Sequence, residues 1–114
     1  MKMNPKNPPR KFRVGEHKQI EISDCASIEL SADEQVTFVT PSGKEYDVAR
    51  KSWGFYATPS VNGRLVKQGF KTALVKNAFG QCYVMLVEPE KMEDFKKYIQ
   101  QENSQVVEWL DERS

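Results

Sequence analysis

Apolar residues alternate with polar ones in several short segments of the chain, and this spacing of two constrains the fold more than any other feature of the sequence. In the first such segment Ile20 and Ile22 flank Glu21. A period of two places successive side chains on opposite faces of a β-strand. The alternation therefore predicts half-buried strands over residues 18–23, 26–30 and 35–40.

Turn residues divide the middle of the chain into pairs of strands. The proline and glycine of segment 40–44 predict a hairpin over residues 35–49. Asn62-Gly63 is the dipeptide best suited to a type I′ turn, and it predicts a second hairpin whose returning strand begins at Arg64. A third pair of strands, 70–76 and 81–87, is expected around residues 77–80. The run Cys82–Val87 does not alternate, which is typical of a central strand covered on both faces.

One segment has helical spacing instead. Pro89 suits the first position of a helix, and the acidic residues that follow it favour the positive end of the helix dipole. Met92, Phe95 and Ile99 then form an apolar stripe. These features predict a helix over about residues 89–101. Residues 106–110 fit a strand or a short helix, and the strand is favoured.

Together these elements indicate a mainly β (α+β) fold, a small antiparallel β-barrel or sandwich of about seven or eight short strands with one C-terminal helix. A chain of 114 residues suits one small domain. Residues 1–10 contain three prolines and no apolar period, so we expect a disordered basic tail there, followed by a single β-rich domain over residues 11–114.

The charged residues are distributed unevenly, although the formal net charge is only +1. Residues 48–87 contain six bases and no acid, whereas residues 88–114 are rich in acids. A positive local potential over the first segment would attract phosphates, carboxylates or an acidic protein surface. In the alternative interpretation these bases form a solvated rim and meet the acidic segment within the fold.

The chain lacks the features of several functional classes. No apolar run is long enough to cross a bilayer and no signal-peptide pattern is found, which favours a soluble, cytoplasmic protein without a membrane partner. We expect no metal and no cofactor, because His17, Cys25 and Cys82 are the only nitrogen or sulfur ligands and lie far apart in sequence. We interpret both cysteines as buried small hydrophobic residues and His17 as an exposed residue at a strand edge.

The stretch from Arg50 to Lys71 combines aromatic rings with bases, amides and hydroxyls, and it is the best candidate for a binding site. Rings supply stacking area, and arginine binds phosphate or carboxylate through two parallel hydrogen bonds. The alternative is that Trp53 and Phe55 belong to the core, as we expect of Trp109. The candidate ligand-binding residues are Trp53, Tyr56, Thr58, Asn62, Arg64 and Lys71.

Within this stretch Gly54, Pro59 and the predicted hairpin are placed as in the second motif of cupins, which this segment resembles. The resemblance implies a small barrel. Where that motif has a metal-binding histidine this chain has Arg64, and no His-x-His lies upstream. The resemblance therefore implies neither a metal nor an activity.

Three functions remain open. The first is a binding module for a small anionic or polar ligand, such as a sugar, sugar nucleotide or nucleotide, with an accessory or sensing role. The second is a metal-free isomerase or epimerase that uses Tyr56, Tyr83, His17 or Glu45 for proton transfer. The third is an interaction module for single-stranded nucleic acid or protein, aided by the basic residues near the N-terminus, although the net charge is low for a nucleic-acid binder. Homodimerisation is also possible, through an edge strand near residues 106–110.

Overall fold

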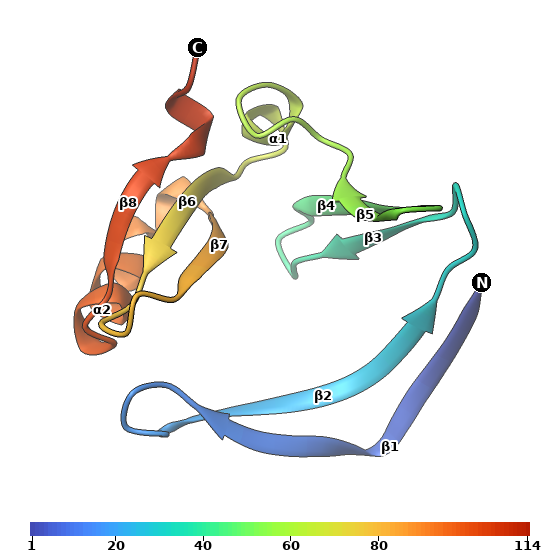
Figure 1. The fold of residues 1–114 in the computed structure, drawn as a ribbon, viewed down its shortest axis with the longest axis horizontal. Coiled ribbons are helices and arrows are strands. Elements are labelled where there is room, and N and C mark those ends of the chain that lie inside the picture. The colour runs from blue at the N-terminus through green and yellow to red at the C-terminus, as the bar shows by residue number, and fades with distance from the viewer. The chain divides into compact units, whose positions relative to one another are not determined.

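The computed structural model describes residues 1–114, of which 49% are in strands and 18% in helices, so the prediction of a mainly β chain is confirmed. Figure 1 shows the elements in chain order. They are β1 (Lys2–Val14), β2 (Ile20–Glu29), β3 (Gln35–Val39), β4 (Glu45–Lys51), β5 (Gly54–Ala57), α1 (Arg64–Lys67), β6 (Lys71–Lys76), β7 (Cys82–Val87), the 3₁₀ turn η1 (Pro89–Lys91), α2 (Met92–Gln101), β8 (Gln105–Trp109) and η2 (Leu110–Glu112).

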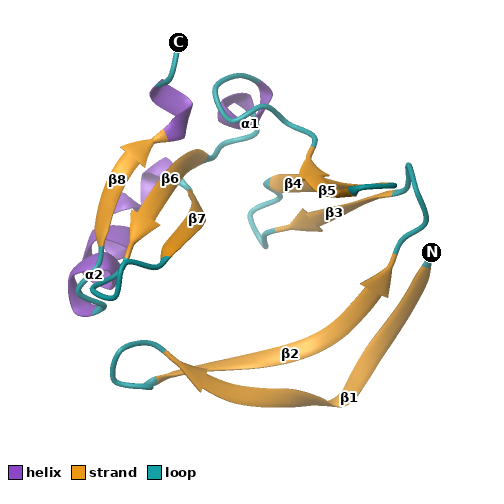
Figure 2. Ribbon diagram, in the orientation of Figure 1, coloured by secondary structure: helices purple, strands orange, loops and turns teal.

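The eight strands form three separate antiparallel sheets (Figure 2). One sheet has the order β1-β2, the second β3-β4-β5 and the third β7-β6-β8. No closed barrel is found, so that part of the prediction is not confirmed. The chain also divides into two compact units, where the sequence suggested one domain after residue 10. Unit 1 comprises residues 1–36 and 48–56, unit 2 comprises residues 37–47 and 57–114, and each is described by itself.

The N-terminal segment is a strand in unit 1, and not the disordered tail that its prolines predict. Residues 2–5 pair with residues 26–29, and after an irregularity residues 10–14 pair with residues 20–24. The prolines that suggested disorder flank or occupy this irregular stretch, which proline tolerates at sheet edges and bulges. Polar contacts across the two strands replace the missing apolar period: Lys6 and Arg10 both bind Asp24.

The hairpin between β3 and β4 forms as predicted. Its turn closes with two backbone hydrogen bonds, from Thr40 N to Lys44 O and from Gly43 N to Thr40 O, each 2.9 Å long. Gly43 has a φ of +90°, a left-handed conformation that glycine adopts without strain.

The hairpin predicted at Asn62-Gly63 is wrong, because Arg64 begins the short helix α1 instead of a strand. Ser60 explains the difference. Its hydroxyl accepts a hydrogen bond from Arg64 N at 3.1 Å, and its carbonyl accepts one from Leu65 N at 3.0 Å. A β-carbon on Gly63 would lie 2.4 Å from the Ser60 hydroxyl. Glycine is therefore needed here for close packing, not for a positive φ.

The sheet β7-β6-β8 contains most of the core of unit 2. Thr72, Ala73 and Val75 of β6 are completely buried, and the Thr72 hydroxyl has no hydrogen-bond partner. The third predicted strand pair is thus confirmed as β6 and β7, but β6, not β7, is the central strand. Cys82 lies exposed on the edge strand and Cys25 is also exposed, so the prediction that both cysteines are buried is wrong.

The C-terminal helix is confirmed as η1 followed by α2, and residues 105–109 form β8, the favoured alternative. The predicted stripe of α2 is its half-buried side. Phe95 from this stripe packs on Trp109 of β8, with ring centroids 5.8 Å apart. Trp109 therefore has the packing role that the sequence suggested.

Shortening the completely buried side chain of α1 tests how strongly the stability of unit 2 depends on this helix. Leu65 is 0% exposed and its neighbour Val66 is 47% exposed. We expect Leu65→Ala to lower the free energy of unfolding by about 2–5 kcal/mol, because it removes buried methyl groups and leaves a cavity. Val66→Ala is the matched control and should change it by less than about 0.5 kcal/mol. Urea denaturation measures both, and equal effects would contradict the buried position of Leu65.

Candidate functional site

Three aromatic side chains in a run of four residues are exposed in unit 1. Trp53 is 71% exposed, Phe55 58% and Tyr56 46%. The alternative in which Trp53 and Phe55 form core is therefore wrong. Because large aromatic side chains gain stability from burial, a group of them facing solvent is typical of a binding surface. We call these three residues, with Arg50 and Lys51, the Trp53–Tyr56 surface.

A tight turn presents these rings. β4 ends at Lys51 and β5 begins at Gly54, so Ser52 and Trp53 alone connect the two strands. Gly54 has a φ of +151°, which side-chain-bearing residues rarely adopt. The turn holds Trp53 near Tyr56, with ring centroids 6.2 Å apart and ring planes tilted by 33°.

Two bases of β4 accompany the rings. The guanidinium carbon of Arg50 lies 5.6 Å from the centroid of the Phe55 ring, within the range of a cation–π contact. Lys51 forms an ion pair with Asp33, whose hydrogen bond raises the pKa of the lysine above its usual value. Arg50 has no carboxylate within ion-pair distance, so it is the base of this surface whose charge is best placed to meet an anion.

Arg64 and Thr58 belong to a polar cluster in unit 2, centred on the carboxylate of Asp47. Asp47 is 6% exposed and accepts hydrogen bonds from the Thr37 hydroxyl at 2.6 Å and from Arg64 at 3.1 Å. Arg64 also binds Gln68 at 2.9 Å and Thr58 at 3.4 Å. The Thr37 hydroxyl, followed by Arg64, lowers the pKa of Asp47 despite its burial. The cluster ties α1 to β3 and β4.

The last two candidates also make contacts inside unit 2. Asn62 donates a hydrogen bond to the carbonyl of Arg113 at 3.1 Å. Lys71 binds Asp111 at 2.8 Å and lies 5.1 Å from the Trp109 ring. The structure thus places Trp53 and Tyr56 together in one unit and joins Thr58 to Arg64 in the other. A ligand-binding role for Thr58, Asn62, Arg64 and Lys71 stays a prediction.

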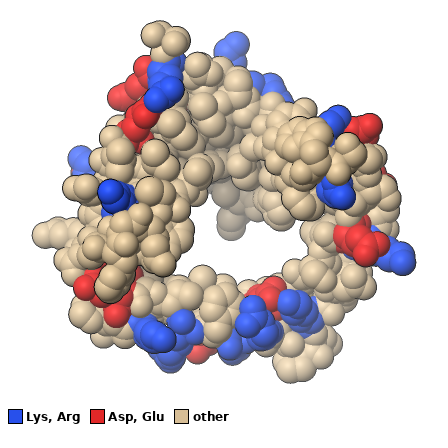
Figure 3. Space-filling view, viewed as in Figure 1, with Lys and Arg blue, Asp and Glu red and all other residues tan.

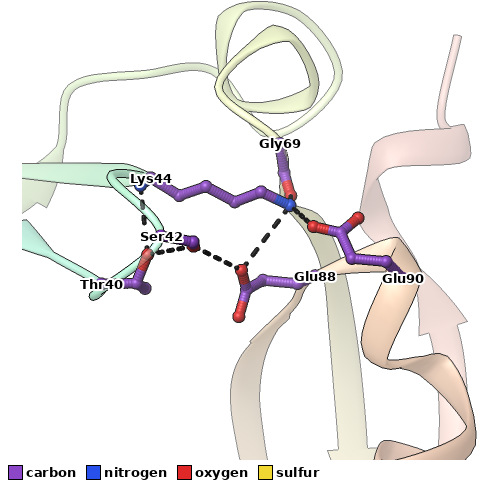
Figure 4. Close-up of polar contacts among 6 residues, drawn as sticks. All are labelled: Thr40, Ser42, Lys44, Gly69, Glu88 and Glu90. Carbon is purple, nitrogen blue, oxygen red and sulfur yellow. Dashed lines mark hydrogen bonds and ion pairs between the residues drawn. The ribbon is translucent and has the colours of Figure 1, made fainter.

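A second polar cluster of unit 2 surrounds the ammonium of Lys44 (Figure 4). Lys44 donates to the carbonyl of Gly69 at 3.2 Å, pairs with Glu90 and lies 3.6 Å from Glu88, while Ser42 also binds Glu88. The lysine side chain passes so close to Gly69 that a β-carbon there would lie 2.8 Å from it. Two carboxylates thus compensate the charge of Lys44. Through these contacts the lysine connects the β3–β4 turn to the segment after β7.

An open depression of about 470 Å³ lies in unit 2 where the β6–β7 turn meets the turn between α2 and β8. Its polar residues are largely engaged in the turns themselves. Asn77, for example, accepts hydrogen bonds from the backbone of Phe79 and Gln81 and donates one to the Gln81 side chain. The lining of the depression also includes no aromatic side chain on which a ring of a ligand could stack, unlike the Trp53–Tyr56 surface.

The basic residues near the N-terminus are matched by acids on β2. Figure 3 shows Lys and Arg side chains along the β1–β2 hairpin with acidic ones among them. Lys11 and Arg13 both lie within 3.8 Å of Glu21, in addition to the pairs at Asp24. In the acid-free segment 48–87, only Lys71 pairs with the acidic C-terminal segment, whereas Lys51 and Arg64 pair with acids that precede them.

No group of three or more histidine, cysteine, aspartate or glutamate side chains is arranged to hold a metal ion, and the expectation of a metal-free protein stays a prediction. None of the helices has the length and apolar character needed to cross a membrane. His17 is exposed in the loop between β1 and β2.

Sequence reasoning did not select Arg50 or Phe55 as site residues, although both lie in the stretch it singled out. Their proximity in sequence was the available signal. Arg50 and Phe55 lie on either side of a short turn, and residues that face each other across such a turn are neighbours through cross-strand pairing. The buried Asp47 lay outside that stretch, and only the fold shows that it meets Arg64.

Comparison with protein families, characterised proteins and solved structures finds no match to this chain. The resemblance to the second cupin motif ends at Pro59, since α1 occupies the place of the expected returning strand.

The pH dependence of stability tests the Asp47 cluster. A carboxylate whose folded pKa is lowered stabilises the fold above its unfolded pKa, about 3.9, and this contribution is lost as the pH falls through the folded pKa. We therefore expect the free energy of unfolding to fall on acidification below about pH 4, and to fall less steeply in Asp47→Asn. Asp47→Asn should also cost about 1–3 kcal/mol at neutral pH.

The control for this experiment is Asp94→Asn, which removes an exposed aspartate of α2. Urea denaturation between pH 3 and pH 7 measures all three proteins. An acid dependence of Asp47→Asn identical to that of the wild type would show that Asp47 does not carry the effect.

Proposed function

We propose that this chain is a binding module for a small anionic ligand that contains a ring, the chemical class of nucleotides and sugar nucleotides, with an accessory or sensing role. The observation that carries the proposal is the 71% exposure of Trp53 beside Tyr56, on a turn next to Arg50. Rings of a ligand stack on aromatic side chains, and a guanidinium binds phosphate or carboxylate.

The electrostatics of the surface support an anionic ligand. Lys51 is neutralised by Asp33, while the Arg50 guanidinium contacts only the Gly54 carbonyl, at 3.5 Å, and the Phe55 ring. A phosphate or carboxylate bound at Arg50 would supply the missing counter-charge. The proposal needs one turn and two strands, so it holds whether or not the small barrel expected from the sequence forms.

We propose further that the protein works in the cytoplasm. Cys25 and Cys82 are both free and exposed. Exposed thiols persist in a reducing compartment and tend to oxidise outside it.

A thermal-shift screen tests the proposal. The probes are nucleoside diphosphates, sugar nucleotides and sialic-type acids, with uncharged nucleosides and single-stranded oligonucleotides for comparison. A ligand that binds the folded state raises the melting temperature by mass action. We expect charged, ring-bearing small molecules to do so and nucleosides not to. A rise confined to oligonucleotides and abolished by salt would instead identify a nucleic-acid module.

The first prediction for a probe that binds concerns Trp53. Trp53→Ala should weaken its binding by about 1–3 kcal/mol, the contribution of one ring stacked on an aromatic side chain. Phe79→Ala is the matched control, because Phe79 is 80% exposed on the β6–β7 turn and has no arginine contact. Isothermal titration calorimetry measures both. Equal affinities for Trp53→Ala and the wild type would remove Trp53 from the site.

The second prediction concerns Arg50. Arg50→Gln should weaken binding of the charged probe by about 1.5–3 kcal/mol, or roughly ten- to a hundredfold, because a hydrogen bond to a charged group is lost. Lys67→Gln, at an exposed base of α1, is the control for a general change in charge. If the two variants lose affinity equally, the effect is long-range electrostatics and Arg50 does not contact the ligand.

A further inference from the structure

The outer edge of β7 has no neighbouring strand, although the strand lacks the charged residues that commonly mark a sheet edge. β6 pairs with it along one edge only, in the order β7-β6-β8. Its six residues, Cys-Tyr-Val-Met-Leu-Val, include no charged side chain. In its first half Tyr83 is 46% exposed and Val84 is 61% exposed. A strand without charges is more typical of the interior of a sheet than of its edge.

β7 also lacks the features by which proteins protect sheet edges, which are charges, prolines, bulges and very short strands. The opposite edge of the same sheet has two of them. β8 carries Glu108, which binds Arg113, and a shift in its pairing with β6 leaves Val107 without a partner residue. The pairing of β7 with β6 runs unbroken from Val87 to Cys82. The β3-β4-β5 sheet has short edge strands of five and four residues.

We propose that the free edge of β7 pairs in antiparallel orientation with β7 of a second copy of this chain. Two β7-β6-β8 sheets then become one continuous sheet. Every second residue of an edge strand turns its N–H and C=O groups away from its neighbour, and a second β7 supplies partners for these groups. Because neither strand is charged, the contact desolvates no charged side chain.

The residues at the two ends of β7 favour the antiparallel orientation. Lys76 pairs with Cys82 at the start of the strand, and Glu88, which also lies 3.6 Å from Lys44, follows Val87 at its end. A two-fold axis near Val84 brings the start of one strand beside the end of the other. This orientation keeps the two Lys76 residues at opposite ends of the contact, and likewise the two Glu88 residues, so like charges do not meet. Such an interface uses the same surface on both copies, so it closes as a dimer.

Analytical ultracentrifugation of three proteins tests the proposal, over concentrations from micromolar to millimolar. The wild type should convert from monomer to dimer as its concentration rises. Val84→Lys places a charge on the β7 edge and should remain a monomer. Val107→Lys is the matched control, because Val107 is 52% exposed on the other edge of the sheet, and it should dimerise like the wild type. A wild type that stays monomeric throughout, or a dimer abolished by Val107→Lys and kept by Val84→Lys, would overturn the proposal.

If Val84→Lys lowers the melting temperature, its monomeric state could reflect unfolding and not the loss of pairing. Cross-linking through a cysteine at position 84 then tests pairing directly. In a background with Cys25→Ser and Cys82→Ser, Val84→Cys places one thiol near the two-fold axis, where opposite residues are close enough for a disulfide. Mild oxidation should convert most of this protein to a covalent dimer, and Val107→Cys should not cross-link. No cross-link from Val84→Cys, or equal cross-linking from both, contradicts pairing through β7.

Discussion

The burial of β6 is the constraint on which unit 2 depends. Thr72, Ala73 and Val75 are completely buried, and β7 and β8 pair with β6 on either side. At the start of the strand, the carboxylate of Asp111 accepts a hydrogen bond from the backbone N–H of Thr72. Burial opposes ionisation of Asp111, but its bonds to Lys71 and Thr72 prevail and lower the pKa of the carboxyl. The Trp109–Phe95 contact then fixes α2 against β8. A single buried strand thus determines where the neighbouring elements lie.

Few other side chains are buried, so polar contacts fasten the remaining elements. Asp47 holds α1 through Arg64, and Lys44 holds the β3–β4 turn through Glu88 and Glu90. These groups are partnered within the fold, and the proposed binding surface at Trp53 and Arg50 does not depend on them. The two tryptophans differ in the same way. Trp109 stabilises the fold, whereas Trp53 lies in solvent on a turn. The residues that stabilise and the residues proposed to bind are therefore largely separate sets.

Local patterns predicted this fold well and long-range ones did not. Alternation, the Thr40–Lys44 turn and the stripe of Phe95 depend on neighbouring residues, and the structure confirms that strands, a hairpin and a helix form there. The two strands predicted over residues 18–23 and 26–30 are one strand, β2, and Ile22 on it is exposed, so the predicted division and burial are wrong. The hairpin prediction at Asn62-Gly63 is wrong because Ser60 accepts hydrogen bonds from the backbone N–H groups of Arg64 and Leu65, which begin a helix. Two local motifs compete for the same segment, and the helical one forms. The prediction that β7 is the central strand is wrong because an apolar run indicates a buried strand but does not indicate which elements lie beside it. For the site, composition selected the stretch that contains Trp53, but the meeting of Arg64 with Asp47 joins residues from different elements and leaves no local signal.

The unpartnered hydroxyl of Thr72 shows that the sequence is not at its stability optimum. A buried hydroxyl without a hydrogen bond costs about 1–3 kcal/mol, and here it lies on β6, beside the completely buried Ala73. Natural chains need only exceed the stability that their function requires, so such imperfections persist. An apolar side chain of the same shape at position 72, facing Leu86 of β7, would therefore remove this cost and raise the free energy of unfolding.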